Sequence, residues 1–91
     1  MRIVHKFKLA IISEQELEIP GFVSFLKVAE QHSILTIWAL VDTERTDIDT
    51  RVIHILGTGG AVKVRSKITP ETYIASVLMS NGLVWPIFTT Y

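Results

Sequence analysis

The feature that most constrains the fold of this chain is a pair of apolar, β-branched runs followed by a glycine cluster. Residues 34–42 read ILTIWALVD, residues 51–56 read RVIHIL, and Gly57-Thr58-Gly59-Gly60 follows directly. Runs of this length that are rich in Ile and Val and bounded by polar turns are typical of β-strands. The pattern predicts an antiparallel β protein, and by itself it names no chemistry.

Alternation of apolar and polar residues predicts strands on both sides of this segment. The turn signal Pro20-Gly21 separates two of them, and the polar residues 43–50 are expected to form a long hairpin loop. The expected strands cover residues 3–11, 15–19, 22–31, 34–42, 51–56, 73–79 and 83–88. We therefore expect one all-β domain over residues 1–91, with about seven mainly antiparallel strands in a meander that forms a small barrel or sandwich.

The last two expected strands flank Ser80-Asn81-Gly82, and Asn-Gly between apolar runs is a strong hairpin signal because both residues tolerate positive φ. Pro86 has no N–H to donate, so its strand is expected at a sheet edge or at a bulge. Before this hairpin, residues 61–68 fit either an extended loop or a short edge strand. Thr69-Pro70-Glu71 fits one helical turn capped by Thr69, although the β-branched residues beyond it favour a strand.

The strand pattern also predicts which side chains form the core. The fourth strand, residues 34–42, is apolar on both faces and is expected to be central. The expected core residues are Ile3, Phe7, Leu9, Leu17, Ile19, Leu26, Val28, Ile37, Trp38, Leu40, Ile53, Ile55, Ile74 and Val77.

Composition narrows the class of function. The nine basic and nine acidic side chains balance, so the net charge argues against nucleic acid and anionic membranes as partners, although a local basic face is compatible with it. The absence of cysteine excludes disulfides and sulfur-ligated metals. No apolar run approaches the roughly 18 residues of a membrane span, and the charged N-terminal residues do not form a signal peptide. We expect a cytoplasmic protein without a cofactor.

Several short blocks resemble a family of small proteins that tailed bacteriophages and prophages encode. The blocks are HKFKL at 5–9, EIP at 18–20, FLKV at 25–28, QH at 31–32, WALVD at 38–42, GTG at 57–59 and YI at 73–74. The likeness covers most of residues 3–88. It implies a phage origin, a location in the host cell and no assigned activity. The chain departs from the family pattern at Gly60 and Pro86, where family members usually carry histidine.

The glycine cluster is the first candidate site. Successive glycines let backbone N–H groups converge on an anion, a threonine adds a hydroxyl, and the basic residues that follow supply charge. The cluster lacks the ending of a Walker loop and the dinucleotide fingerprint, and a tight turn that needs positive φ is the alternative explanation. The ligand-binding residues expected from the sequence are Gly57, Thr58, Gly59, Gly60, Lys63 and Arg65.

The remaining candidates are histidines, tryptophans and arginines. His5, His32 and His54 lack metal-like spacing, and buried histidines bonded to backbone carbonyls are expected at His5 and His54. Trp85, beside Pro86, is expected at an interface. Trp38 is a candidate for stacking on a base, although we expect it in the core. Arg45 and Arg51 are expected to solvate the polar loop or to pair with Asp42, Asp47 and Asp49.

These observations favour a non-enzymatic binding protein, because no nucleophile with a base and no metal-ligand set is recognisable. With the phage resemblance, we expect it to counteract a host defence system by sequestering a small phosphate-bearing, nucleotide-like signal or by masking a host protein. The alternative is a small structural or assembly protein of the phage particle that uses exposed strand edges. A hydrolase acting through His54 is a weaker third hypothesis. An apolar chain with several edges is expected to form a homo-oligomer.

Overall fold

The computed structural model describes residues 1–57 and 68–91 and confirms the all-β class. In these residues the strands are β1 (Arg2–Lys8), β2 (Glu14–Pro20), β3 (Phe22–Gln31), β4 (Ile34–Asp42), β5 (Ile48–Ile55), β6 (Tyr73–Leu78) and β7 (Val84–Thr90), with a short 3-10 turn, η1 (Pro70–Thr72), before β6. The bounds of β3 and β4 coincide with the expected ranges, because the alternation and the flanking turn residues mark both ends of each strand.

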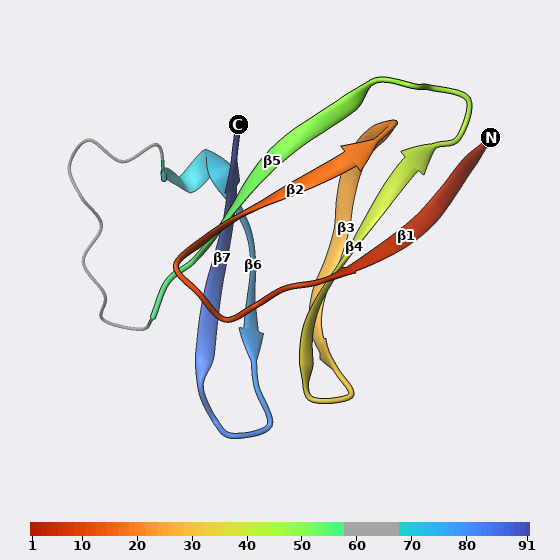
Figure 1. The fold of residues 1–91 in the computed structure, drawn as a ribbon. Helices are drawn as coiled ribbons and strands as arrows, with labels where there is room; N and C mark the ends of the chain where they lie inside the picture. Colours follow the sequence, from red (N-terminus) through yellow and green to blue (C-terminus); the bar gives the residue numbers. More distant parts are fainter. Residues whose placement is uncertain (58–67) are drawn as a thin grey trace.

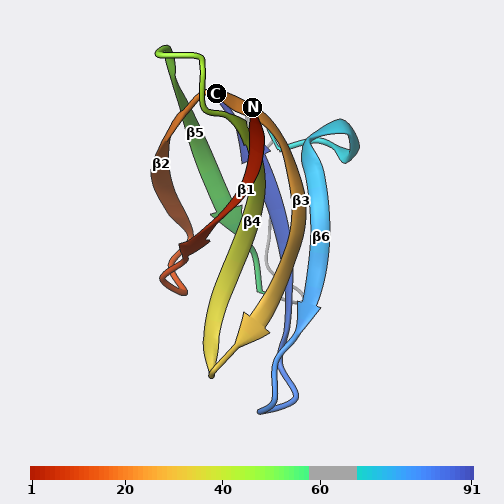
Figure 2. The ribbon, with the colours of Figure 1, turned by 90° about the vertical axis from the view of Figure 1, so that its right-hand side faces the viewer.

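The strands form two antiparallel sheets that pack face to face as a small sandwich (Figures 1 and 2). One sheet has the order β1-β4-β3, and the other has the order β2-β5-β7-β6. The order departs from a simple meander because β1 pairs with β4 and β2 pairs with β5. Residues 43–47 therefore cross from one sheet to the other, and the hairpin expected there is wrong. As expected, β4 is the central strand of its sheet.

Two tight hairpins join sequential strands. Between β3 and β4, His32 and Ser33 have φ of 51° and 65°, as in the two-residue turn whose central residues both need positive φ. The hairpin expected between β6 and β7 is confirmed, with Gly82 at φ 86°. Asn81 is not among the positive-φ residues. Its side-chain oxygen instead accepts the N–H of Leu83 at 3.0 Å, which closes the loop locally.

Pro86 lies in an internal strand, so the expected edge position is wrong, and the irregularity in the β6–β7 pairing lies near Tyr73 and Ala75 instead. The Pro86 carbonyl accepts the N–H of Leu56 at 3.0 Å. Because β5 ends at Ile55, Pro86 stands just beyond the regular β5–β7 ladder. Its missing N–H therefore removes one terminal bond and interrupts no central ladder.

The segment that begins at Thr69 contains both a helical turn and a strand, the two structures that the sequence left open. Pro70–Thr72 form the 3-10 turn η1, and β6 begins at the next residue. The N–H of Thr69 donates to the Thr72 hydroxyl at 3.0 Å, which fixes the start of the turn. The expectation for residues 61–68 lies outside the described residues except for Ile68. Among the residues described, no helix has the length and apolar character that crossing a bilayer requires.

The core lies between the sheets. Its fully buried large side chains are Ile19, Leu35, Ile37, Ile53 and Ile87. Seven expected core residues are buried, namely Leu9, Ile19, Val28, Ile37, Ile53, Ile55 and Val77, and Ile3, Phe7, Leu17 and Ile74 pack against them while partly exposed.

Three of the expected core residues point away from the core. Leu26 is 52% exposed, because the register of β3 shifts between Phe25 and Lys27 and the extra residue reverses the alternation. Trp38 and Leu40 are only half-buried. They alternate with Ile37, Ala39 and Val41, which fill the interior, so they project from the opposite face of β4. Trp38 is therefore a surface residue of the sandwich.

Candidate functional site

The outer face of the three-stranded sheet gathers basic and aromatic side chains. We define this basic face by cross-strand register with Trp38 and Thr36 of β4, of which Trp38 is half-buried and Thr36 is buried. Its members are Lys6 and Lys8 of β1, Trp38 and Thr36 of β4, and Lys27 of β3. The two edge strands thus place lysines beside the tryptophan of the central strand.

Trp38 has a lysine directly opposite it on each neighbouring strand. Lys6 is its register partner on β1, and Lys27 is its partner on β3. Side chains that are directly opposite in an antiparallel pair lie about 4.5–5.5 Å apart at Cβ. The Lys27 ammonium lies 5.7 Å from the centroid of the Trp38 ring, within the range of a cation–π contact. The ring is therefore partly exposed between two positive charges.

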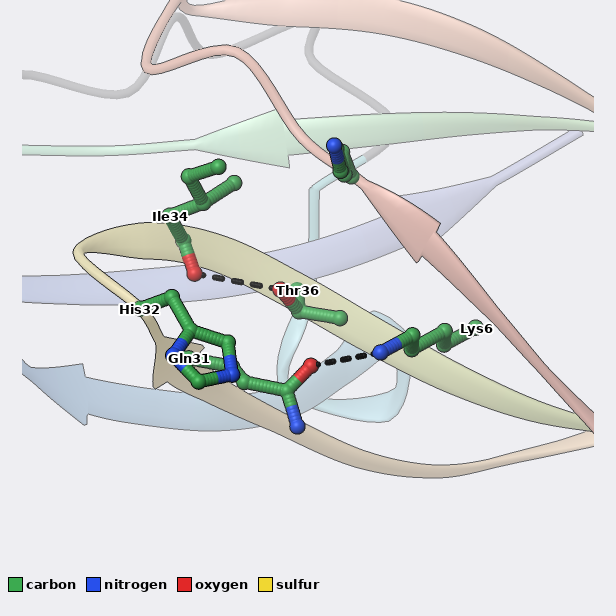
Figure 3. Close-up of a pocket in the computed structure, with 6 residues that line it drawn as sticks. Lys6, Gln31, His32, Ile34 and Thr36 are labelled. Atoms are coloured by element: carbon green, nitrogen blue, oxygen red, sulfur yellow. Dashed lines mark hydrogen bonds between the residues drawn. The ribbon is translucent and has the colours of Figure 1, made fainter.

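A small pocket continues the basic face toward the β3–β4 hairpin (Figure 3). Its volume is 230 Å³, and Lys6, Lys8, Gln31, His32, Ile34 and Thr36 line it. The Lys6 ammonium donates to the Gln31 amide oxygen at 2.9 Å, and the Thr36 hydroxyl donates to the Ile34 carbonyl at 3.1 Å. In Figure 3 the Gln31 amide lies between Lys6 and the His32 ring. Lys6 lines this pocket and is also the register partner of Trp38, so the pocket and the ring lie side by side.

Charge is divided between the two outer faces although the net charge of the chain is zero. In the described part of the chain, Lys6, Lys8 and Lys27 form no ion pair with a carboxylate. The outward residues of β2, at the edge of the other sheet, are Glu14, Glu16 and Glu18, all exposed. The balanced composition therefore conceals a basic face on one sheet and an acidic edge on the other.

One acid stands at the far end of the basic face. Asp42 is the register partner of Arg2, and its carboxylate accepts the N–H of Glu44 at 3.0 Å. This hydrogen bond, with the nearby N-terminal ammonium and Arg2, holds the pKa of Asp42 below its ordinary value of 3.8. Asp42 is thus occupied by these neighbours, and the lysines around Trp38 keep their charge available.

The glycine cluster lies mostly outside the described residues. Thr58, Gly59, Gly60, Lys63 and Arg65 fall in that part, so their expected role in ligand binding stays a prediction. Gly57 is described and exposed, and it does not have positive φ. A Cβ atom there would lie 3.6 Å from Cζ3 of Trp85, an ordinary contact. Neither a left-handed turn nor a close approach explains glycine at this position.

Trp85 and Pro86, the expected interface residues, are both half-buried in β7. Trp85 packs against the core from inside the sandwich, as its register partner Val77 does. Its indole Nε1 is buried and has no hydrogen-bond partner. The interface role stays a prediction, and Trp85 presents less free surface than that role suggested.

The histidines differ from the expected buried pattern. His5 is exposed on β1. His54 is half-buried, and its Nε2 lies 2.8 Å from the Thr90 hydroxyl, so a side chain replaces the expected backbone carbonyl. Within residues 1–57 and 68–91, no three His, Cys, Asp or Glu side chains converge as a metal site.

The two arginines have separate roles. Arg45 pairs with Asp47, as the sequence allowed, and it also donates to the Phe22 carbonyl at 3.0 Å. Arg51 forms no ion pair among the described residues. Its guanidinium packs on aromatic rings instead, and the side chain lines a second pocket.

Sequence reasoning placed none of the three lysines in a site. The signal was present in part, because the alternation of β1 puts Lys6 and Lys8 on one face. Their position beside Trp38 depends on β1 pairing with β4 across about 30 residues of chain. Periodicity carries no information about that pairing.

Comparison with known proteins gives a family and no activity. The chain belongs to the family described as a domain of unknown function (DUF7352), whose model matches residues 1–91. No curated protein and no solved structure matches the chain.

Proposed function

We propose that this chain is a non-enzymatic binding protein that holds a small phosphate-bearing ligand with an aromatic base on its basic face. The observation that carries the proposal is the half-buried Trp38 side chain on the outer face, with a lysine opposite it on each neighbouring strand. A tryptophan that only filled the core would not need a lysine opposite it on both neighbouring strands. A flat ring flanked by cations matches the two parts of a nucleotide.

Trp38 supplies the surface for the base. Stacking of a nucleic acid base on an aromatic side chain contributes about 1–3 kcal/mol and tolerates any base, because every base has a π face. The pleat of β4 holds the Trp38 ring on a rigid central strand, so little side-chain entropy is lost on binding. Lys27 contacts the ring from the β3 side, which leaves the surface toward β1 for the ligand.

Lys6 and Lys8 supply the phosphate site. They lie on the same face of β1, two residues apart, and both line the pocket that extends from Trp38 to the hairpin. The His32 ring and the Gln31 amide add further polar groups there. Ammonium groups without carboxylate partners bind phosphate as point charges. The pocket is small, which favours one or two phosphate groups over a long polymer.

In the phage setting that the sequence resemblance implies, we propose that such a protein acts in the host cytoplasm. It would sequester a nucleotide-like signal of a host defence system. Masking of a host protein is the alternative mode of the same binding role. A structural protein that pairs through exposed strand edges is the second candidate. The edge strands β1 and β2 carry charged side chains on alternate residues, which disfavours edge pairing, whereas the edge strand β6 carries no charged residue.

Tryptophan fluorescence tests the proposal directly. In a Trp85→Phe background, Trp38 is the remaining tryptophan. We expect AMP, cyclic AMP and cyclic di-AMP to quench its emission with saturation, and we expect adenosine and ribose 5-phosphate to bind at least about tenfold more weakly. Each of these two compounds lacks one of the groups that the site recognises, and about 1.4 kcal/mol corresponds to a factor of ten.

Matched variants separate the two parts of the site. Lys6→Gln and Lys8→Gln are expected to weaken nucleotide binding and to reduce its dependence on salt. Trp38→Leu removes the fluorescent probe, so its binding is measured by titration calorimetry, and it is expected to lose the preference for nucleotides over ribose 5-phosphate. Glu16→Gln, on the other sheet, is the control and should leave affinity unchanged. Absence of saturable quenching by all three nucleotides would refute the proposal and favour masking of a host protein.

A further inference from the structure

In Figure 1, η1 lies beside the end of β7. A second pocket is lined by residues of both and lies at this end of the four-stranded sheet. Its volume is 380 Å³, within the range of about 300–1,000 Å³ that is common for small-molecule sites. Its lining residues are Arg51, Glu71, Thr72, Tyr73, Thr89, Thr90 and Tyr91. None of these residues belongs to the basic face.

Aromatic rings hold the Arg51 side chain in this pocket. The guanidinium carbon lies 4.7 Å from the centroid of the Phe22 ring and 4.0 Å from that of the Tyr91 ring. Nη2 also donates to the Tyr91 hydroxyl at 3.0 Å. Stacking on rings is typical of arginine and fixes the plane of its guanidinium. Arg51 is therefore positioned in advance of any ligand.

Two polar groups of this pocket lack partners. The Arg51 Nε and the Thr89 hydroxyl are buried without a hydrogen bond. The other hydroxyls there are satisfied: Thr90 contacts His54 at 2.8 Å, and Thr72 donates to the Thr69 carbonyl at 2.8 Å. Buried donors without partners are rare in folded proteins and call for an explanation. Among ligand oxygens that can accept from a guanidinium and a hydroxyl, those of a carboxylate or a similar oxyanion form the strongest bonds.

The same pocket contains an acidic group. Glu71 is part of the lining, and no ion pair joins it to Arg51 or to another cation in the part of the chain that the structure describes. The Thr69 hydroxyl holds the pKa of Glu71 below its ordinary value of 4.5, so the side chain is ionised at neutral pH. One pocket therefore carries a fixed positive group and a negative group that do not neutralise each other.

We propose that this pocket binds a small zwitterion of the α-amino acid class. The ligand carboxylate would accept from the Arg51 guanidinium and the Thr89 hydroxyl, and its ammonium group would face Glu71. The ring of Tyr73, which contacts that of Phe88 at 5.5 Å, provides apolar surface for the ligand side chain. This site is independent of the nucleotide site, since the two share no residue.

The test uses amide NMR spectra of the full chain with probes that differ by one charge. L-Leucine is compared with 4-methylpentanoate, which lacks the ammonium, and with 3-methylbutylamine, which lacks the carboxylate. L-Phenylalanine is compared with 3-phenylpropionate and 2-phenylethylamine. We expect at least one amino acid to shift the amides of Thr72, Thr89 and Thr90 with saturation, and we expect its two analogues to bind at least about tenfold more weakly.

Two conservative variants keep the fold and test the roles of single groups. Thr89→Val removes the unpaired hydroxyl at nearly constant volume and should weaken amino-acid binding about fivefold, as expected for one hydrogen bond. Glu71→Gln should abolish the preference for the amino acid over the analogue without ammonium. Trp38→Leu serves as the control and should leave this binding unchanged whatever the fate of the nucleotide proposal. Shifts by neither amino acid, or equal binding of an amino acid and its deaminated analogue, would overturn the inference.

Discussion

Gly21 lies so close to Asp42 that a Cβ atom at Gly21 would overlap the Asp42 carbonyl oxygen. The Gly21 N–H donates to the Asp47 carbonyl, and the Gly21 carbonyl accepts the N–H of Asp42, each at 2.8 Å. Gly21 also has φ of 65°. The turn between β2 and β3 is thus bonded to the crossover between β4 and β5, and only glycine fits at this junction.

Gly21→Ala should therefore destabilise the protein far more than Gly82→Ala. Both positions have positive φ, which costs roughly 1–2 kcal/mol for a residue with a Cβ. At Gly82 nothing lies within 4 Å of the added atom, so the strain is the whole cost. At Gly21 the steric overlap adds about 1–3 kcal/mol or more. Urea unfolding of the two variants measures the difference, and equal losses would show that the junction can relax.

Trp38→Ala should cost less stability than Ile37→Ala, although tryptophan is the larger residue. Ile37 is fully buried, and truncation of such a side chain costs about 2–5 kcal/mol. Trp38 is half-buried on the outer face, so we expect about 1–2 kcal/mol. The expectation that Trp38 is a core residue predicts the reverse order. Chemical denaturation of the two variants decides between them.

Asp47 should contribute to stability only above acidic pH. The hydrogen-bonded Arg45 guanidinium holds the pKa of the Asp47 carboxyl below its ordinary value of 3.8. Because the folded-state pKa is the lower one, the unfolded chain binds more protons, and the contribution is present above pH 3.8 and is lost as pH falls through the folded-state pKa. Asp47→Asn should therefore show a flatter fall in unfolding free energy below about pH 4 than the wild type.

The partner of this ion pair provides the control. Arg45→Gln removes the charge that lowers the pKa of Asp47. It should therefore also flatten the fall of the unfolding free energy at acid pH. If the unfolding free energy of Arg45→Gln falls at acid pH as steeply as that of the wild type, a group other than this ion pair causes the fall. Both side chains are exposed, so high salt should reduce the effect in the wild type.

Replacement of His32-Ser33 by Asn-Gly should stabilise the hairpin between β3 and β4. Both residues have positive φ, where Asn and Gly are the favoured pair. We expect a gain of about 1 kcal/mol, measured as a shift of the denaturation midpoint with unchanged slope. His32 lines the phosphate pocket, so the variant should also bind nucleotides more weakly. Gained stability together with unchanged nucleotide affinity would remove His32 from the proposed site.

Self-association stays a prediction that light scattering can test. We expect a mass above the 10.3 kDa of one chain at micromolar concentration. The described surface offers exposed apolar side chains near Trp85, with Leu78 before the turn of the last hairpin and Leu83 and Val84 after it. Leu78→Glu with Leu83→Glu should then lower the measured mass. A mass of one chain across the whole concentration range would contradict the prediction.

The sequence predicted the strands well because strand bounds are local. The bounds of β3 and β4 follow from alternation and from turn residues on either side. The assignment of strands to sheets could not be predicted in the same way. β1 pairs with β4, and β2 with β5, over long separations, and no periodicity within a strand encodes its neighbour.

The candidate sites were harder to predict for a related reason. Both faces of β4 are apolar, so alternation could not tell whether Ile37 or Trp38 points to the core. The register of β3 shifts twice, and the shift between Phe25 and Lys27 turns Leu26 out of the core. Arg51 was expected to pair with acids, whereas tertiary contacts place it against Phe22 and Tyr91. In each case the decisive contact lies far away in sequence.

The position of β7 has a consequence for how this fold is reached. β7 follows every other strand in the chain, yet it lies between β5 and β6 in its sheet. On a ribosome, where synthesis proceeds from the N-terminus, β5 and β6 wait with unpaired edges until β7 emerges. Most pairings join distant segments, so closure is expected to be slow for a chain of this size. Nascent chains that end before Val84 should therefore aggregate or recruit chaperones.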